Sequence, residues 1–92
     1  MDARQILHVV EMYEKRLSES GIPKTAMDSN KTFGSLSKSE TLAHAHYLID
    51  GVKKYLPDPS KEGKVNRHLA SIQMCLSFAD WYTLEDLKSH NR

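Results

Sequence analysis

Three segments of the chain repeat apolar residues at intervals of three and four, the spacing that puts side chains on one face of an α-helix. The repeats are Ile6, Val10, Tyr13 and Leu17; Leu42, Ala45, Ile49, Val52 and Leu56; and Val65, Leu69, Ile72, Leu76 and Ala79. Gly21 with Pro23 ends the first repeat, and Pro57 with Pro59 ends the second, because proline cannot continue a helix. No stretch shows the alternation of a strand. The sequence therefore predicts an all-α fold, a small helical bundle of three main helices.

Residues at the helix starts sharpen these boundaries. Ser37 followed by Glu40 matches a capping box, and Thr83 followed by Asp86 resembles one. Ser60 is a plausible N-cap for the third main helix. We therefore expect helices over about residues 3–19, 38–56 and 61–79, with a short C-terminal helix over about 84–90. Helices two and three should form an antiparallel hairpin, with helix one laid across it.

The segment 21–36 has no helical period and is expected to be a loop, partly ordered through Ile22, Met27, Phe33 and Leu36. With 92 residues, the chain has room for one core, so 1–92 is expected to be a single domain. Its net charge of +1 gives no general attraction to nucleic acid or anionic lipid. The absence of a long apolar run argues against a membrane protein, and the single cysteine fits a cytoplasmic protein.

The histidines raise the question of a metal site. His44 and His46 are two positions apart on one predicted helix, so their rings diverge by about 160–200° and cannot hold one ion together. Glu40, His44, His68 and His8 could converge from different helices, but the chain has no Glu-x-x-His motif. We expect no metal, no cofactor and no catalytic residue, with histidines at the core boundary whose nitrogens reach water. Cys75 lies among apolar neighbours and is expected to be a buried structural thiol.

Basic residues gather where helices two and three join, at Lys53, Lys54, Lys61, Lys64 and Arg67. A cluster of this kind can contact phosphates, so a nucleic-acid-binding accessory protein is one interpretation of the chain. The same cluster is equally compatible with the solvated end of a bundle. The connection contains two prolines and does not resemble the short turn of a helix-turn-helix motif.

Several apolar residues lie outside the three repeats. Those predicted to form an interface are Met12, Tyr47, Met74 and Phe78. Methionine and aromatic side chains suit adaptable binding surfaces, so the leading interpretation is a non-enzymatic interaction module. Its partner would be another protein or a second copy of the chain. The alternative is that these residues complete the core of a monomer.

With Arg67, Leu69 and Ile72 followed by Tyr82, Thr83 and Asn91, the C-terminal half resembles a family of small uncharacterised helical proteins of bacteriophages and prophages. The positions that carry the resemblance are Arg67, Leu69, Ile72, Gln73, Tyr82, Thr83, Glu85, Asp86, Leu87 and Asn91, and "ETLAHAHYLIDGVKKYL" is similar to the preceding helix of that family. His68 and Ala70 stand where the family has an aromatic residue and a glycine. The resemblance covers residues 40–92 and implies a phage-type accessory protein, without implying any catalytic residue.

Overall fold

Each apolar repeat forms a helix in the computed structural model, which describes residues 1–92. The helices are α1 (Ala3–Glu19), α2 (Lys38–Tyr55), α3 (Glu62–Phe78) and the short α4 (Leu84–His90). Two single-turn 3-10 helices, η1 (Phe33–Ser35) and η2 (Pro59–Lys61), lie in the connections. The predicted all-α class, with three main helices and a short C-terminal one, is confirmed, and the structure contains no strand.

Three of the helices begin with a reciprocal capping box, in which two side chains satisfy backbone N–H groups at the helix start. The pairs are Asp2 with Gln5, Ser37 with Glu40, and Thr83 with Asp86. In the second pair both hydrogen bonds measure 3.1 Å. The two boxes read from the sequence are therefore present. The box at α1, formed by Asp2 and Gln5, was not predicted from the sequence.

The predicted N-cap of the third helix is wrong. Ser60 lies inside η2, where its backbone N–H and its hydroxyl both donate to Asp58, at 3.0 and 2.7 Å. Asp58 therefore caps η2, and Pro59 occupies the first position of that turn. The α-helix starts only at Glu62, behind Lys61, which makes no side-chain cap.

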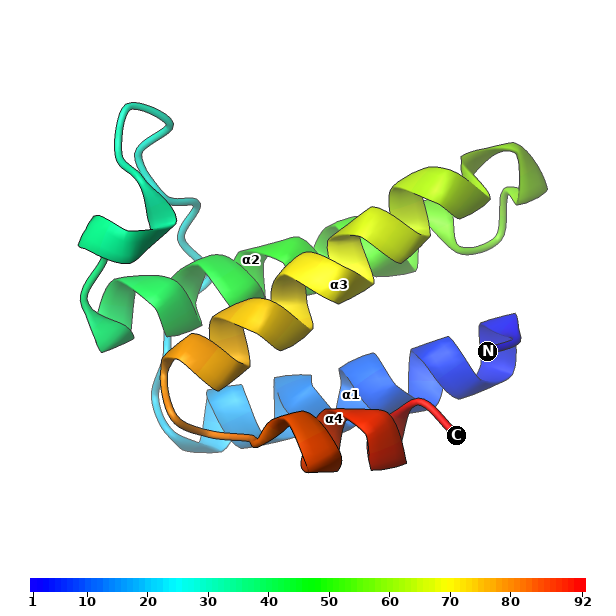
Figure 1. Cartoon of the computed structure of the whole chain (residues 1–92). Helices are drawn as coiled ribbons and strands as arrows, with labels where there is room; N and C mark the ends of the chain where they lie inside the picture. Colours follow the sequence, from blue (N-terminus) through cyan, green and yellow to red (C-terminus); the bar gives the residue numbers. More distant parts are fainter.

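The helices alternate in direction along the chain (Figure 1). α2 and α3 lie side by side as an antiparallel hairpin, and α1 and α4 lie together on the lower side of it. One cluster of 15 buried residues fills the space between α1, α2 and α3, and it contains all the apolar repeat residues except Leu56, which packs against it. Tyr13, Leu17, Ile49, Ile72 and Leu76 are its largest fully buried members.

Both α1 and α3 end with a residue in the left-handed conformation. Gly21 has φ +72° after α1, and the N–H of Ile22 then returns to the carbonyl of Leu17 at 3.0 Å. Asp80 has φ +64° after α3, and the N–H of Trp81 returns to Leu76 in the same way. Glycine adopts this conformation without strain, whereas aspartate has a Cβ that opposes it.

The 21–36 loop is attached to the bundle at several points along its length. Ile22 packs against the core, and the Thr25 N–H donates to the Ala43 carbonyl at 3.2 Å. The middle of the loop stands out from the bundle near the start of α2, on the side of α2 opposite α1 (Figure 1). The expectation that Phe33 pins the loop to the core is wrong, because its side chain is 47% exposed.

A buried polar network fastens α4 to α1 and α3. The Gln73 amide donates to the Tyr13 hydroxyl at 3.1 Å and pairs reciprocally with the Asn91 amide at 2.6 and 3.2 Å. The Tyr13 oxygen also lies 2.7 Å from His90 Nδ1. Burial raises the pKa of Tyr13 to about 12. Since buried polar groups without partners are costly, this network favours one position for α4.

Trp81 lies at the corner between α3 and α4. Its ring is half-buried against the core, and the Arg16 guanidinium stacks 4.1 Å from its centroid. The same guanidinium lies 5.0 Å from the Tyr82 ring. Arg16 therefore closes this end of the core by a cation–π contact with both rings.

Candidate functional site

The two central histidines contact different parts of the molecule. His44 accepts a hydrogen bond from the Met27 N–H at Nδ1, at 3.1 Å. His46 is 4% exposed, with Nδ1 2.8 Å from the Ile22 carbonyl and Nε2 3.5 Å from the Ser18 hydroxyl. The expectation that histidine nitrogens reach water is wrong for His46. Both rings hold the 21–36 loop in place.

The residues considered for a metal site do not come together. Glu40 pairs with Lys31 at 3.1 Å and with the backbone of Ser37, and these contacts hold the pKa of its carboxyl below the usual value. No group of three or more His, Cys, Asp or Glu side chains is placed to hold a metal ion. Cys75 is 1% exposed, and burial raises the pKa of its thiol to about 11, which fits the expected structural role.

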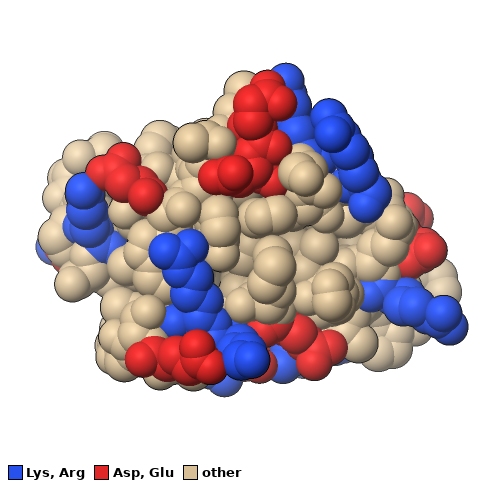
Figure 2. All heavy atoms as spheres, turned by 90° about the horizontal axis from the view of Figure 1, so that it is seen from below, with Lys and Arg blue, Asp and Glu red and all other residues tan.

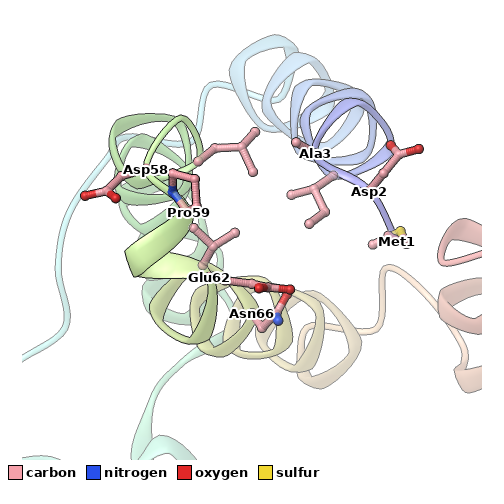
Figure 3. A pocket seen from close by; sticks show the side chains of 10 residues that line it. Met1, Asp2, Ala3, Asp58, Pro59, Glu62 and Asn66 are labelled. Atoms are coloured by element: carbon pink, nitrogen blue, oxygen red, sulfur yellow. The ribbon is translucent and has the colours of Figure 1, made fainter.

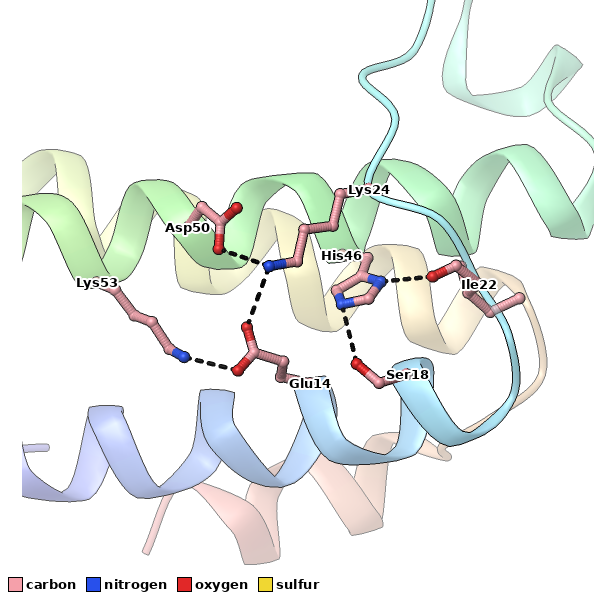
Figure 4. A network of polar contacts seen from close by, with 7 residues as sticks. All are labelled: Glu14, Ser18, Ile22, Lys24, His46, Asp50 and Lys53. Atoms are coloured by element: carbon pink, nitrogen blue, oxygen red, sulfur yellow. Dashed lines mark hydrogen bonds and ion pairs between the residues drawn. The ribbon is translucent and has the colours of Figure 1, made fainter.

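The structure divides the predicted basic cluster. Lys53 turns toward α1, where it donates to the Glu14 carboxylate at 2.6 Å (Figure 4). Lys24 from the loop reaches the same carboxylate at 3.7 Å and Asp50 at 3.1 Å. Lys53 is therefore part of a charge network that links α1, the loop and α2, and its charge is already compensated.

Two other lysines of the cluster meet at one tyrosine. The Lys64 ammonium lies 4.4 Å and the Lys54 ammonium 5.2 Å from the centroid of the Tyr55 ring. Hydrogen bonding from Lys64, followed by the charge of Lys54, lowers the pKa of Tyr55. Lys61 lies on η2, and Arg67 is exposed on α3, so neither belongs to this pair.

The lysine pair borders a groove of about 440 Å³ between α2 and α3, which we call the seam groove. It is lined by Tyr47, Leu48, Asp50, Gly51, Lys54, Tyr55, Lys64 and His68. At its base the His68 ring lies so close to Gly51 that a Cβ there would stand 2.8 Å from His68 Cδ2. Sequence reasoning did not identify this groove, although an unexplained glycine inside a helix signals close approach by a neighbour.

The four predicted interface residues lie on three separate surfaces. Tyr47 borders the seam groove, and Met12 lies in a charged hollow of α1 beside Glu11 and Lys15. Met74 and Phe78 lie one turn apart on α3 and are 50% and 59% exposed. Phe78 also lines a small notch together with Phe33, Gly34, Leu36, Lys38 and Thr41. Only Met74 and Phe78 therefore share a surface.

A further pocket, of about 260 Å³, opens between the start of α1 and the turn that joins α2 to α3 (Figure 3). Its walls include Ile6, Leu56 and Val65, while Glu62 and Asn66 lie at its α3 side. The Asp58 carboxylate turns away from it, toward Ser60. Its volume is below the range of about 300–1,000 Å³ typical of small-molecule sites.

Charged side chains of both signs alternate over the face formed by α1 and α4 (Figure 2). They lie in small groups around a broad uncharged area, in agreement with a net charge of +1. This face therefore carries no extended field of one sign that would attract a polyanion.

The comparisons with known proteins give no family. No protein-family model, no curated protein and no solved structure matches the chain. No helix has both the length and the apolar character needed to cross a bilayer. The resemblance to phage proteins therefore stays a prediction.

Proposed function

We propose that the protein is a non-enzymatic helical interaction module that binds a second copy of itself through the outer face of α3. The observation that carries this proposal is the pair Met74 and Phe78, half-exposed and one turn apart. Phe33, also about half-exposed, extends the apolar surface across the notch beside Phe78. Apolar residues grouped in this way on a small protein mark an interaction site more often than isolated ones do.

The outer face of α3 is complementary to itself. In chain order it presents Arg67, then Ala70 and Ser71, then Met74 and Phe78, all exposed except the half-buried Ser71. In an antiparallel pair of α3 helices, Met74 meets the small side chains of the partner copy. Arg67 then meets the partner's Phe78, which permits a cation–π contact of about 0.5–1 kcal/mol. A two-fold axis repeats both contacts.

The expected dimer is weak. Two crossing helices of this length bury on the order of 1,000 Å², at the lower end of specific interfaces. We therefore expect a dissociation constant on the order of 10 μM, equivalent to about 7 kcal/mol. A phage-type accessory role and a cytoplasmic location belong to the same proposal. They are supported by the sequence resemblance over 40–92 and by a single thiol that is buried and unpaired.

Light scattering across a concentration series tests the proposal. The wild-type protein should shift from monomer to dimer, and the double variant Met74→Ser with Phe78→Ser should stay monomeric while keeping its helical circular dichroism. The matched control, Leu7→Ser with Met12→Ser, removes two apolar side chains from α1 that are each 37% exposed. That control should dimerise like the wild type. A wild-type monomer at every concentration, or equal loss in the control, would overturn the proposal.

A further inference from the structure

We infer that the seam groove binds a nucleoside phosphate, with the phosphate between Lys54 and Lys64 and the base against the Tyr47 ring. The seam groove shares no lining residue with the outer face of α3, although Phe33 borders both surfaces, and the inference does not depend on dimer formation. Of the five residues in the predicted basic cluster, only Lys54 and Lys64 belong to this site. Four features of the groove support the inference.

The first feature is uncompensated positive charge. Neither Lys54 nor Lys64 forms an ion pair, because the six ion pairs of the molecule all involve other lysines. Both ammonium groups nevertheless lie within 5.2 Å of one ring centroid, that of Tyr55. Two like charges held at one ring repel each other, and a phosphate between them would relieve that repulsion. The same two lysines lower the pKa of Tyr55, through a hydrogen bond from Lys64 and then the charge of Lys54.

The second feature is the compensation of the single carboxylate in the groove. Asp50 could repel a phosphate, but Lys24 pairs with it at 3.1 Å from the side of the loop. The pair turns Asp50 toward α1 and the loop (Figure 4). The lining of the groove therefore has two lysines without a carboxylate partner and one carboxylate that is paired with Lys24.

The third feature is the line of rings that leads out of the groove. Tyr47 is 48% exposed and stacks on His44, with centroids 6.1 Å apart and planes at 21°. Phe33 follows at 5.9 Å from His44 and is itself 47% exposed. Exposed rings beside lysines are the usual combination for stacking bases while holding a phosphate backbone. Because the line continues beyond the groove, a short single strand fits it better than a free nucleotide.

The fourth feature is a fixed polar group at the base of the groove. The His68 Nδ1–H donates to the Lys64 carbonyl at 2.9 Å, so the lone pair of a neutral ring lies at Nε2. Gly51 allows the ring to lie against the α2 backbone. His68 is thus held in place by its own helix, with the Cδ2–Nε2 edge of its ring against Gly51 of α2. The groove volume of about 440 Å³ lies in the range of small-molecule sites.

Binding can be measured at low salt by anisotropy with a fluorescent eight-nucleotide single strand, and by calorimetry with uridine monophosphate and with inorganic phosphate. Lys54→Ala with Lys64→Ala should weaken both nucleotide ligands about tenfold or more. Lys15→Ala with Lys61→Ala, the matched control, removes two lysines outside the groove and should leave affinity unchanged. Tyr47→Leu should weaken both nucleotide ligands but not inorganic phosphate. With two phosphate contacts, log K for the strand should fall against log salt with a slope of about −1.4.

Comparing the affinities for the three ligands shows which kind of molecule supplies the phosphate. Tighter binding of the strand than of the monophosphate supports a single-stranded nucleic acid, and equal binding supports a free nucleotide. No binding of either nucleotide ligand overturns the inference. It is also overturned if inorganic phosphate binds as tightly as the nucleotides, or if the control lysines matter as much as the groove lysines. The backbone amide of Gly51, followed by NMR, shows whether the ligand enters the groove itself.

Discussion

Removal of one hydroxyl tests whether the buried network positions α4. In Tyr13→Phe the ring and its packing stay, but the Gln73 N–H that donates to Tyr13 at 3.1 Å loses its acceptor. Tyr13 is fully buried and Gln73 is 7% exposed, so no bulk water replaces the hydroxyl. An unsatisfied buried donor costs about 1–3 kcal/mol. His90 is half-buried and can turn to water, so its lost contact at 2.7 Å adds little. We expect a loss of about 2 kcal/mol.

Urea unfolding followed by circular dichroism measures this loss, and thermal unfolding should show a midpoint lower by about 10 °C. A second variant shows whether the loss of stability comes from the unsatisfied Gln73 amide or from altered packing of the ring. Tyr13→Phe with Gln73→Met removes the unpaired donor as well, so the double variant should be no less stable than Tyr13→Phe alone. A change below about 0.5 kcal/mol in Tyr13→Phe, or simple additivity of the two substitutions, would refute the reasoning.

Three further predictions concern other buried or crowded groups. Burial and the charge of His68 lower the pKa of His44 from 6.5, and only the neutral ring accepts from Met27. The free energy of unfolding from urea titrations should therefore be highest above about pH 6.5 and decrease at lower pH. A free energy of unfolding that does not change with pH contradicts this. Gly51→Ala should not stabilise the protein despite the better helix propensity of alanine, because the new Cβ would collide with the His68 ring. Once that ring is removed, Gly51→Ala with His68→Ala should be about 1 kcal/mol more stable than His68→Ala alone, measured by thermal unfolding. A stabilised single variant contradicts the close approach. Cys75, with a thiol pKa raised to about 11, should resist a thiol reagent at pH 8 until the protein unfolds; fast native labelling argues against burial.

The helices could be predicted because their signals are local. Apolar spacing and capping residues give bounds within one or two residues of those observed, since each acts within a turn or two of its own position. The N-cap of α3 was wrongly assigned to Ser60, because Asp58 caps η2 there and Ser60 lies inside that turn. Asp80 in the left-handed conformation has no sequence signal comparable to Gly21.

The surfaces could not be predicted to the same extent, because they depend on which side chains meet across helices. Lys53 and Lys54 are adjacent in sequence, yet Lys53 pairs with Glu14 on α1 and Lys54 lies at the seam groove. A helix turns about 100° per residue, so neighbours in sequence face different partners. Likewise, Met74 and Phe78 share a face because they are four residues apart, but their distance from Met12 and Tyr47 depends on how the helices pack.

Self-association through the outer face of α3 is tested most directly by isotope-filtered NMR on an equal mixture of ¹³C-labelled and unlabelled protein. The account predicts contacts between molecules from the Met74 methyl group to the partner's Ala70 and Ser71. It also predicts contacts from the Phe78 ring to the partner's Arg67. Absence of any contact between molecules at concentrations well above 10 μM, or contacts from the Met12 methyl group instead, would contradict it.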